Sequence, residues 1–207
     1  MNRPLIVTGT DTDIGKTVFA AGLAAALGAH YWKPVQAGLD DGSDSGRVAA
    51  LGVPKDKILP EAYRLTTPCS PHRAAEIDGV TIDPAQLELP DIAWPLVVEG
   101  AGGALVPVTR DLLYADLFAR WGAPTIIVAR TALGTINHSL LTIEALRSRK
   151  VSILGIAFIG ERVPDSEDTI CAISGVQRLG RLPVLDPLTP ETLAAAFANA
   201  FDLEQFA

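Results

Sequence analysis

The amino-acid sequence predicts an α/β fold of one domain, with a doubly wound, mostly parallel sheet and helices on both faces. Short, uninterrupted apolar runs alternate with longer segments of helical spacing, which is the pattern of strands buried between two layers of helices. The chain has 207 residues, of which 48% are hydrophobic and 20% are charged. This length and composition are typical of one globular domain with a complete core. No break in the pattern divides residues 1–207 into two domains.

The first elements follow one another closely. The apolar residues 5–7 predict a strand, and residues 17–27 predict a helix, because large apolar side chains recur there every four positions. The glycine that follows predicts the end of this helix. Residues 31–35 predict a second strand, which contains a Lys-Pro step. Residues 36–90 are rich in Gly, Pro, Ser and Asp and show one short helical stretch near residues 46–51, so they predict long functional loops with small helices.

The regular alternation resumes in the second half of the chain. Strands are predicted at residues 96–98, 124–128, 151–159 and 181–185. Helices are predicted at residues 112–121, at residues 136–149 and from Thr189 onward. The sequence Thr189-Pro190-Glu191 supplies an N-cap, a first-turn proline and an acidic first turn for the last of these helices.

The composition argues against several kinds of partner and site. A net charge of −7 argues against nucleic acid or an anionic membrane surface as the main partner, because both require a positive field. Cys69 and Cys171 are too few for a disulfide framework and form no Cys-x-x-Cys pair, so we expect reduced thiols and no zinc site. We see no signal peptide, and no stretch reaches the roughly 18 apolar residues of a membrane span. The expected location is therefore the cytoplasm.

The strongest local motif lies between the first predicted strand and the first predicted helix. Residues 9–17 read Gly-Thr-Asp-Thr-Asp-Ile-Gly-Lys-Thr, which matches a phosphate-binding loop in its ending and its position. Five residues separate Gly9 from Gly15, where the standard motif has four, so the loop is a variant. Amides at the helix start would bind phosphate, Lys16 would bridge the β- and γ-phosphates, and the Thr17 hydroxyl would bind Mg²⁺. We therefore expect a Mg²⁺–nucleoside triphosphate as ligand.

A second acidic element follows the strand predicted at residues 96–98. Glu99 stands at the end of this strand, and the glycine-rich residues 100–103 come next. Ligands of open α/β sheets bind beyond the carboxyl ends of the strands, so the Glu99 carboxylate can face the metal there. The glycines would let the loop approach phosphate or substrate. Lys33 lies at the end of another predicted strand and is expected at the same edge of the sheet.

Five motifs occur in order along the chain. They are residues 8–17, residues 33–38 (Lys-Pro-Val-Gln-Ala-Gly), residues 70–72 (Ser-Pro-His), residues 98–103 (Val-Glu-Gly-Ala-Gly-Gly) and residues 133–142 (Leu-Gly-Thr-Ile-Asn-His-Ser-Leu-Leu-Thr). Only the first is specific alone, but together they resemble the dethiobiotin synthetase family of the biotin pathway. The resemblance extends from about residue 5 to about residue 186. It implies a P-loop NTPase-type fold for the predicted sheet.

The resemblance also implies a reaction. Members of this family are ATP-dependent cyclo-ligases that carboxylate 7,8-diaminononanoate with CO₂ and close the ureido ring. The products are dethiobiotin, ADP and phosphate. The reaction proceeds through a carbamate, whose oxygen attacks the γ-phosphate, and a carbamic-phosphoric anhydride. Two negative groups meet in that step, so cations must lie beside them.

The resemblance implies site residues as well. The catalytic residues would be Lys33, Lys16 and Thr12, and Mg²⁺ would be held by Thr17, Asp44 and Glu99. ATP would be bound by Asp13, Ile14, Gly15, Lys16, Thr17, Val18, Asp44, Glu99, Gly100, Ala101, Gly102, Gly160, Glu161, Pro183, Val184 and Leu185. The substrate would be bound by Thr12, Lys33, Ala37, Gly102, Gly103, Thr135, Ile136 and Asn137.

The resemblance further implies a homodimer. Residues 134–139 open a helix, whose first amides could hold the distant carboxylate of the substrate bound in the neighbouring subunit. His138 and His72 are expected to be structural hydrogen-bonding residues rather than catalytic ones.

The chain departs from the family pattern at three positions. Ala37 stands where family members often carry Ser or Thr, so one contact with the substrate is expected to be missing. Asp13 stands where many relatives have Glu, and its carboxylate could attract an ammonium group of the diamine. Gly160 stands where relatives often have an Asn that reads the adenine edge. The backbone near residues 160–161 and 183–185 would then shape the base pocket, and selectivity for adenine stays open.

Three other functions are alternatives. A partitioning ATPase, acting as a nucleotide-driven switch, would carry an extra lysine near the start of the phosphate loop, where this chain has Thr10 and Asp11. A ligase of the cobyrinate type would need a further glutaminase region, for which the chain has no length. A catalytically inactive relative, suggested by Ala37 and Gly160, would be distinguished by measuring turnover.

Overall fold

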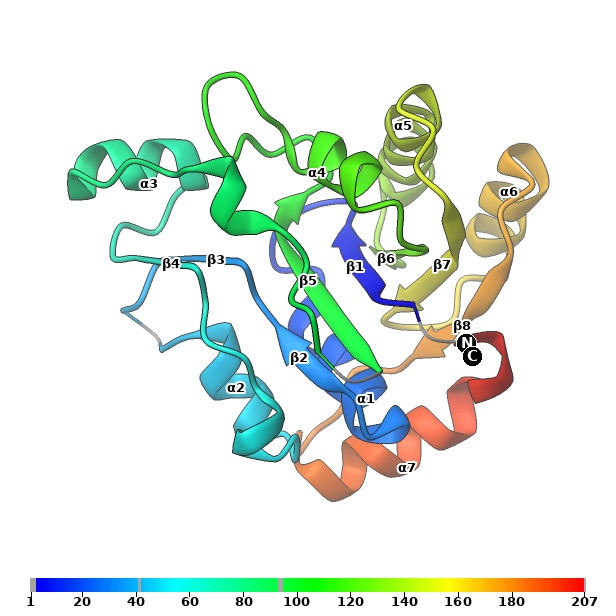
Figure 1. Ribbon diagram of the computed structural model, residues 1–207. Coiled ribbons are helices and arrows are strands. Elements are labelled where there is room, and N and C mark those ends of the chain that lie inside the picture. The colour runs from blue at the N-terminus through cyan, green and yellow to red at the C-terminus, as the bar shows by residue number, and fades with distance from the viewer. Residues whose placement is uncertain (1–2, 41, 93–94, 207) are drawn as a thin grey trace.

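A parallel sheet forms the centre of the computed structural model, which describes residues 3–40, 42–92 and 95–206 (Figure 1). The strand order is β2-β5-β1-β6-β7-β8, and each neighbouring pair is parallel. The strands are β1 (Leu5–Gly9), β2 (His30–Trp32), β5 (Leu96–Gly103), β6 (Thr125–Arg130), β7 (Ile153–Ile159) and β8 (Arg178–Leu182). This confirms the predicted α/β domain with a mostly parallel sheet.

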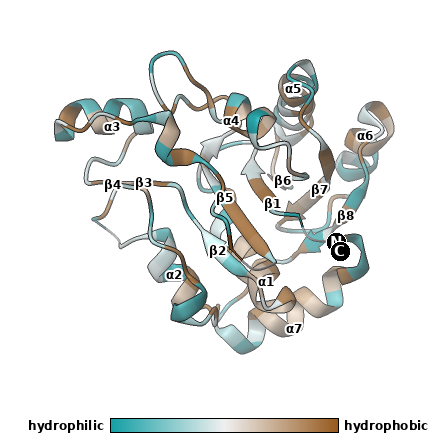
Figure 2. Cartoon of the chain, viewed as in Figure 1, coloured by the Kyte–Doolittle hydropathy of each residue, from teal (hydrophilic) through white to brown (hydrophobic). Residues whose placement is uncertain are grey.

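Helices cover both faces of the sheet, as Figure 1 shows. One face packs against α1 (Lys16–Leu27), α2 (Asp44–Ala50) and α7 (Pro190–Ala200). The other face packs against α4 (Tyr114–Trp121), α5 (Thr135–Ser148) and α6 (Pro164–Ser174). The same core continues into α3 (Pro71–Asp78), which packs against residues 35–37 and 63–65 beside the main sheet. The strands are mostly hydrophobic, while hydrophilic residues gather on the outer sides of helices such as α3 and α6 (Figure 2). Burial of apolar side chains in both layers therefore holds the sheet in place.

The segment at residues 36–90 contains more regular structure than the sequence predicts. Besides α2, it forms α3 and a second, two-stranded parallel sheet, in which β3 (Val35–Ala37) pairs with β4 (Tyr63–Leu65). It also forms the 3-10 helices η1 (Lys55–Lys57) and η2 (Pro84–Leu87). The expected small helices are present, and α2 lies near the helical stretch expected at residues 46–51. The small sheet was not predicted, because three-residue strands that pair across 28 positions leave no periodic pattern.

Two other element predictions need correction. The run at residues 31–35 is divided into β2 and β3, because the chain turns at the Lys-Pro step and leaves the main sheet. The last strand lies at Arg178–Leu182 rather than at residues 181–185; it pairs with β7 and ends before Pro183. This edge strand contains arginines at residues 178 and 181, so it does not form the continuous apolar run by which the other strands were predicted. Helix α6 was not predicted, since few of its residues are large and apolar.

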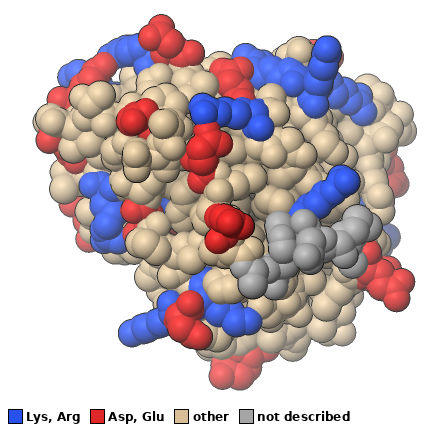
Figure 3. All heavy atoms as spheres, in the orientation of Figure 1, with Lys and Arg blue, Asp and Glu red and all other residues tan. Residues whose placement is uncertain are grey.

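The strand order decides where a ligand can bind. Strand β1 lies between β5 and β6, and the carboxyl ends of β1, β2 and β5 meet at one edge of the sheet. Open parallel sheets bind ligands at such an edge. Acidic and basic side chains are interspersed among uncharged residues on the face seen in Figure 3, so neither sign dominates that face. Within the described ranges, we find no helix with the length and hydropathy needed to cross a membrane.

Candidate active site

The loop between β1 and α1 is built to expose backbone amides. Asp13 and Gly15 have positive φ angles of 54° and 92°, and Gly15 is the N-cap of α1 without a side-chain hydrogen bond to the helix. The first amides of α1 are therefore left for a ligand rather than for a capping side chain. Their partial positive charge makes this turn suited to an anion such as phosphate. The structure thus has the local form that the phosphate-loop motif predicts.

Lys16 folds back over this loop. Its Nζ donates a hydrogen bond of 2.9 Å to the carbonyl oxygen of Asp11, and the side chain is buried. Burial, and next the positive charge of Lys33, lower the pKa of Lys16 to about 8. An arriving polyphosphate would reverse this shift, because an anion stabilises the ammonium form. Lys16 is therefore positioned to respond to the charge of a nucleotide.

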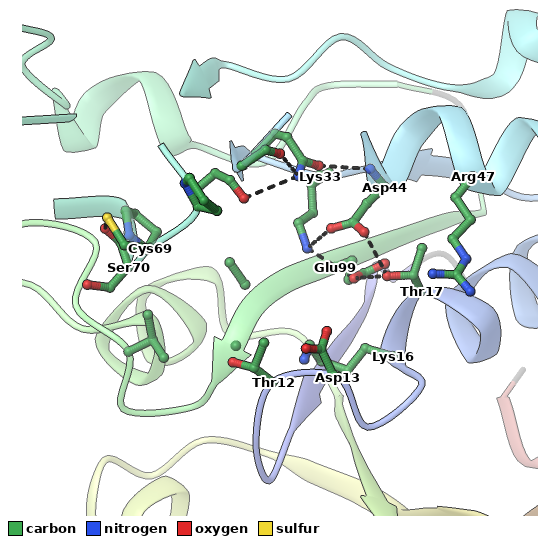
Figure 4. Close-up of a pocket in the computed structure, with 18 of the residues that line it drawn as sticks. Thr12, Asp13, Lys16, Thr17, Lys33, Asp44, Arg47, Cys69, Ser70 and Glu99 are labelled. Atoms are coloured by element: carbon green, nitrogen blue, oxygen red, sulfur yellow. Dashed lines mark hydrogen bonds and ion pairs between the residues drawn. The ribbon is translucent and has the colours of Figure 1, made fainter. Parts of the chain in front are cut away.

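Three oxygen-bearing side chains converge beside Lys16, from three different elements. The Thr17 hydroxyl on α1 lies 2.9 Å from Glu99 Oε1 on β5 and 3.1 Å from Asp44 Oδ1 on α2 (Figure 4). A hydroxyl has one proton and can donate to only one of these carboxylates at a time. Thr17 therefore contacts both of the other predicted metal-binding residues, although 82 positions separate it from Glu99.

Lys33 lies against the same two carboxylates. Its Nζ is 2.7 Å from Asp44 Oδ2 and 3.0 Å from Glu99 Oε1, and it donates a hydrogen bond of 3.1 Å to the Gly100 carbonyl. Burial alone would lower the pKa of Lys33, but Glu99 and Asp44 outweigh burial and raise it above its usual value. Burial likewise opposes ionisation of Asp44, yet Lys33 lowers the pKa of this carboxyl. Lys33 is therefore a buried cation that stays charged.

Two residues that the sequence analysis missed hold these carboxylates in place. The buried Tyr31 hydroxyl donates a hydrogen bond of 2.9 Å to Glu99 Oε2. Burial and the Glu99 charge raise the pKa of Tyr31 far above its usual value, so the phenol stays a donor. Gln36 Oε1 accepts a hydrogen bond of 2.9 Å from the Asp44 backbone amide. No motif contains Tyr31, and only the tertiary contact reveals its role.

The oxygen donors fit a hard divalent cation. Among residues 3–40, 42–92 and 95–206, no group of three His, Cys, Asp or Glu residues could hold a metal by itself. Mg²⁺ does not need such a group, because it keeps several waters and takes one or two carboxylates together with substrate phosphates. The Thr17 hydroxyl and the carboxylates of Asp44 and Glu99 supply three oxygen-bearing ligands of this type.

A cavity of about 910 Å³ connects this cluster with a second region. On one side it is lined by the phosphate loop and the start of α1. On the other it reaches a wall of small and apolar residues that includes Ala37, Pro68 and Pro71. The predicted site residues that line the cavity are Thr12, Asp13, Gly15, Lys16, Thr17, Val18, Lys33, Ala37, Asp44, Glu99, Ala101 and Gly102. Gly100 contributes its carbonyl to Lys33, and Ile14 is buried behind the loop.

The remaining predicted residues lie outside this cavity in two groups. Gly103 lines a neighbouring hollow of about 440 Å³, which His138 also lines. Neither cavity is lined by Thr135, Ile136 or Asn137, which form the first turn of α5. One chain by itself therefore does not bring these three residues to the cluster around Lys33.

The second group lies at the carboxyl ends of β7 and β8. The Gly160 amide donates to the Leu182 carbonyl at 3.0 Å, and Arg181 donates to the Gly160 carbonyl at 2.7 Å. These contacts bring Glu161 on one strand end near Pro183, Val184 and Leu185 on the other. A Cβ at Gly160 would lie 2.5 Å from Thr131 Oγ1, so this chain has no room there for an asparagine.

Fold and cavity together define a P-loop nucleoside triphosphate-binding protein, and comparisons with solved structures agree on the fold. The cell division ATPase MinD of Pyrococcus furiosus is 14% identical, with a TM-score of 0.58 and 95% coverage of both chains. A ParA family ATPase from Chlorobium tepidum is 13% identical, with a TM-score of 0.53, and the match covers 95% of this chain and 90% of that one. At such low identity the likeness concerns the fold alone.

Sequence comparisons identify the family. An AAA domain family matches residues 3–192. A protein of Novosphingobium aromaticivorans named ATP-dependent dethiobiotin synthetase BioD is 66% identical over 98% of each chain. A protein of the same name from Rhizorhabdus wittichii is 66% identical over the full length of both, and one from Rhodopseudomonas palustris is 63% identical over 100% of this chain and 99% of that one. The chain belongs to the ATP-dependent dethiobiotin synthetases, a family of ATP-dependent cyclo-ligases. The resemblance found in its motifs is therefore confirmed.

Proposed function

We propose that this enzyme carboxylates 7,8-diaminononanoate with CO₂ and closes the ureido ring at the expense of ATP, giving dethiobiotin, ADP and phosphate in the cytoplasm. The observation that carries the proposal is that one cavity contains both parts of the site. It joins a phosphate-binding loop to a small apolar region, with Lys33 between two carboxylates at the junction. A reaction in which a carbamate meets a phosphoryl group needs this arrangement of a buried cation beside the nucleotide site.

Magnesium would be held by Thr17, Asp44 and Glu99, and the Thr17 hydroxyl already lies within 3.1 Å of an oxygen of each carboxylate. When bound, the ion would neutralise charge on the β- and γ-phosphates. The chain's own contribution is to fix these ligands. Tyr31 holds the far oxygen of Glu99, and Gln36 holds the backbone at Asp44. The carboxylates therefore need little reorganisation when the ion arrives.

The chemical steps use the two lysines as fixed positive charges. One amine of the substrate attacks CO₂, loses a proton and becomes a carbamate. A carbamate oxygen then attacks the γ-phosphorus, and the bond from that phosphorus to ADP breaks. The second amine attacks the carbonyl carbon, phosphate leaves and the ring closes. Lys33 would stabilise the approaching carbamate, because its carboxylate partners keep it protonated. Lys16 would stabilise the β- and γ-phosphates.

The diamine would occupy the part of the cavity away from α1. Thr12, Ala37 and Gly102 line the cavity with Lys33, and Asp13 adds a carboxylate that can attract an ammonium group. Gly103 lines the neighbouring hollow, on the far side of the glycine-rich loop. Ala37 has no hydroxyl, so we expect one substrate hydrogen bond fewer than in relatives with Ser or Thr at this position.

The distant carboxylate of the substrate would be held by a second copy of the chain. Thr135, Ile136 and Asn137 form the first turn of α5, where backbone amides are available to an anion. They lie outside the cavity of their own chain, which supports a role across the interface of a homodimer. Sedimentation at micromolar concentration tests this: a purely monomeric enzyme that turns over at the same concentration would contradict it.

The base of the nucleotide would lie against the ends of β7 and β8. Backbone groups would contact the base there, from Gly160, Glu161, Pro183, Val184 and Leu185. Gly160 has no side chain with which to form a hydrogen bond to adenine. We therefore expect weak discrimination among bases. Comparing kcat/KM for ATP, GTP and CTP measures this directly; a preference for ATP of a thousandfold or more would contradict it.

Phosphate release tests the proposed function. The enzyme is incubated with Mg²⁺ and ATP, with or without 7,8-diaminononanoate and bicarbonate. We expect phosphate release to require both, and to match dethiobiotin formation one to one. Release that ignores the diamine would support a nucleotide switch instead. Carboxylation with ¹⁸O-labelled CO₂ tests the anhydride: one labelled oxygen must appear in phosphate, and unlabelled phosphate would exclude that intermediate.

A further inference from the structure

One charged residue in the cavity has no part in the functions described so far. Arg47 lies on α2, one turn after Asp44, and lines the same cavity. Residues three apart on a helix share a face, so α2 presents a carboxylate and a guanidinium to the site together. In Figure 4 the Arg47 side chain extends from α2 toward Thr17. Its position is therefore next to the cluster that would hold the metal.

The cations of the cavity differ in how their charge is balanced. Lys33 is neutralised by Asp44 and Glu99 at 2.7 Å and 3.0 Å. Lys16 is buried, and its Nζ donates a hydrogen bond of 2.9 Å to the carbonyl oxygen of Asp11. Arg47 is exposed and always protonated, and no ion pair joins it to a carboxylate within the described ranges. It is thus a permanent positive charge available to a polyanion.

The geometry also indicates which part of the polyanion Arg47 can reach. The cavity has two sides, with Lys33, Asp44 and Glu99 between them (Figure 4). Cys69 and Ser70 lie on the side proposed for the diamine, and Arg47 lies on the opposite side. The transferred phosphoryl group must meet the carbamate beside Lys33. The phosphates that stay in ADP then extend away from the diamine, along the start of α1.

We propose that Arg47 is a further nucleotide-binding residue, whose guanidinium contacts the phosphates retained in ADP. This inference rests on the proposed function, because it requires a triphosphate in the cavity. Arg47 would add a charge-assisted hydrogen bond at a position that main-chain amides do not cover. Because this contact is to the retained phosphates, it strengthens binding of ATP and ADP alike.

The test uses the full-length enzyme and three variants. Arg47→Met removes the charge, Arg47→Lys keeps it without the planar fork, and Lys55→Met removes an exposed charge from η1, outside the cavity. Titration calorimetry measures the Kd of Mg–ADP and of a Mg-bound non-hydrolysable ATP analogue. We expect Arg47→Met to raise both Kd values about tenfold, which is the scale of one partly exposed charged hydrogen bond. Arg47→Lys should recover part of the affinity, and Lys55→Met should match the wild type.

Two outcomes would overturn the role of Arg47, and a third would overturn the proposed function on which it rests. Equal Kd values for Arg47→Met and Lys55→Met would overturn it. A loss confined to the triphosphate analogue would also overturn it, because the contact would then be to the transferred phosphoryl group. If the wild type itself neither binds nucleotide nor forms dethiobiotin, the proposed function fails, which is a different result. Urea unfolding confirms that each variant is folded, as expected for a change at an exposed position.

Discussion

Lys33 shows how a single residue depends on the whole site. Its ammonium group is buried between Asp44 and Glu99, which together neutralise it. Removing one partner of a buried ion pair leaves an uncompensated charge and costs more than the pair contributes. A substitution at Lys33 therefore acts on stability and on catalysis at once, and both must be measured.

We predict that Lys33→Met abolishes most turnover while nucleotide binding is largely kept. Loss of one preorganised cation facing the reacting phosphoryl group should lower kcat by about a hundredfold or more. The two carboxylates left behind should destabilise the free protein by about 3 kcal/mol. Mg²⁺ should restore more stability to the variant than to the wild type, which thermal unfolding with and without the ion would detect. Unchanged turnover would remove Lys33 from the site.

Lys16 makes nucleotide binding depend on pH. Its pKa is lowered to about 8 in the free enzyme, and bound phosphates raise it. Affinity for Mg–ATP should therefore be full below pH 8 and should fall as pH rises from 8 toward the pKa of the bound state. At pH 8.5 binding should take up a fraction of a proton, which calorimetry in two buffers of different ionisation enthalpy measures. A wild-type affinity that stays constant from pH 7 to pH 10 would contradict the assignment; Lys16→Met is the control without this titration.

Tyr31 is predicted to tune the metal site through Glu99. Tyr31→Phe removes the hydrogen bond of 2.9 Å to Glu99 Oε2 and leaves a buried carboxylate oxygen without a donor. We expect the Mg²⁺ concentration for half-maximal activity to rise several-fold, with KM for the diamine unchanged. Tyr63→Phe is a control, because it also removes one tyrosine hydrogen bond, which the Tyr63 hydroxyl accepts from the Asp83 amide away from the site. If both variants need the same Mg²⁺ concentration as the wild type, Tyr31 is only a packing residue.

At the residue scale, motifs predicted the groups that carry chemistry, and contacts revealed the groups that position them. Lys16 and Thr17 follow from a loop whose spacing is tied to phosphate geometry. Tyr31 and Gln36 each form one hydrogen bond to the site. Tyr31 lies in no motif, and the motif that contains Gln36 does not show what this glutamine contacts. Their role depends on which strand lies beside which, and that is decided by the packing of the whole sheet.

At the scale of elements, α1 carries the site and is fixed by its contact with α7. Gly22 lies in the middle of α1, where a Cβ would approach Phe197 Cδ2 to 2.5 Å. Phe197 also packs against Phe19, with ring centroids 5.6 Å apart. The small residue therefore allows two helices to approach closely, and this contact keeps the first turn of α1 directed at the ligand.

We predict that Gly22→Leu destabilises the protein by about 1–3 kcal/mol, because an overpacked core must shift side chains or backbone. Ala26→Leu introduces the same side chain at an exposed position of α1 and should change stability by less than about 0.5 kcal/mol. Urea unfolding compares the two free energies. Equal stability of both variants would show that α1 and α7 are not in tight contact.

The elements that were predicted and those that were missed differ in a physical respect. Strands β1, β6 and β7 are buried on both faces, so continuous apolar runs mark them. Strand β8 lies at the edge of the sheet and carries arginines, while β3 and β4 have three residues each. Such segments become strands because a partner is nearby, and a single sequence does not show that partner.

At the scale of the whole molecule, function depends on the joining of distant segments in one cavity. The four central residues lie on different elements: Thr17 on α1, Lys33 in the turn after β2, Asp44 on α2 and Glu99 on β5. The parallel sheet brings the carboxyl ends of β1, β2 and β5 to one edge, where the nucleotide and the diamine of the proposed reaction would meet. The first turn of α5 lies outside that cavity, and the proposed homodimer would complete the substrate site.

A crystal structure with Mg²⁺, a non-hydrolysable ATP analogue and 7,8-diaminononanoate would test this account most directly. We expect the triphosphate on the amides of residues 15–18, the ion against Thr17, Asp44 and Glu99, and an amine of the substrate beside Lys33 and the γ-phosphate. A nucleotide bound elsewhere, or a diamine separated from the γ-phosphate by the wall of the cavity, would contradict it.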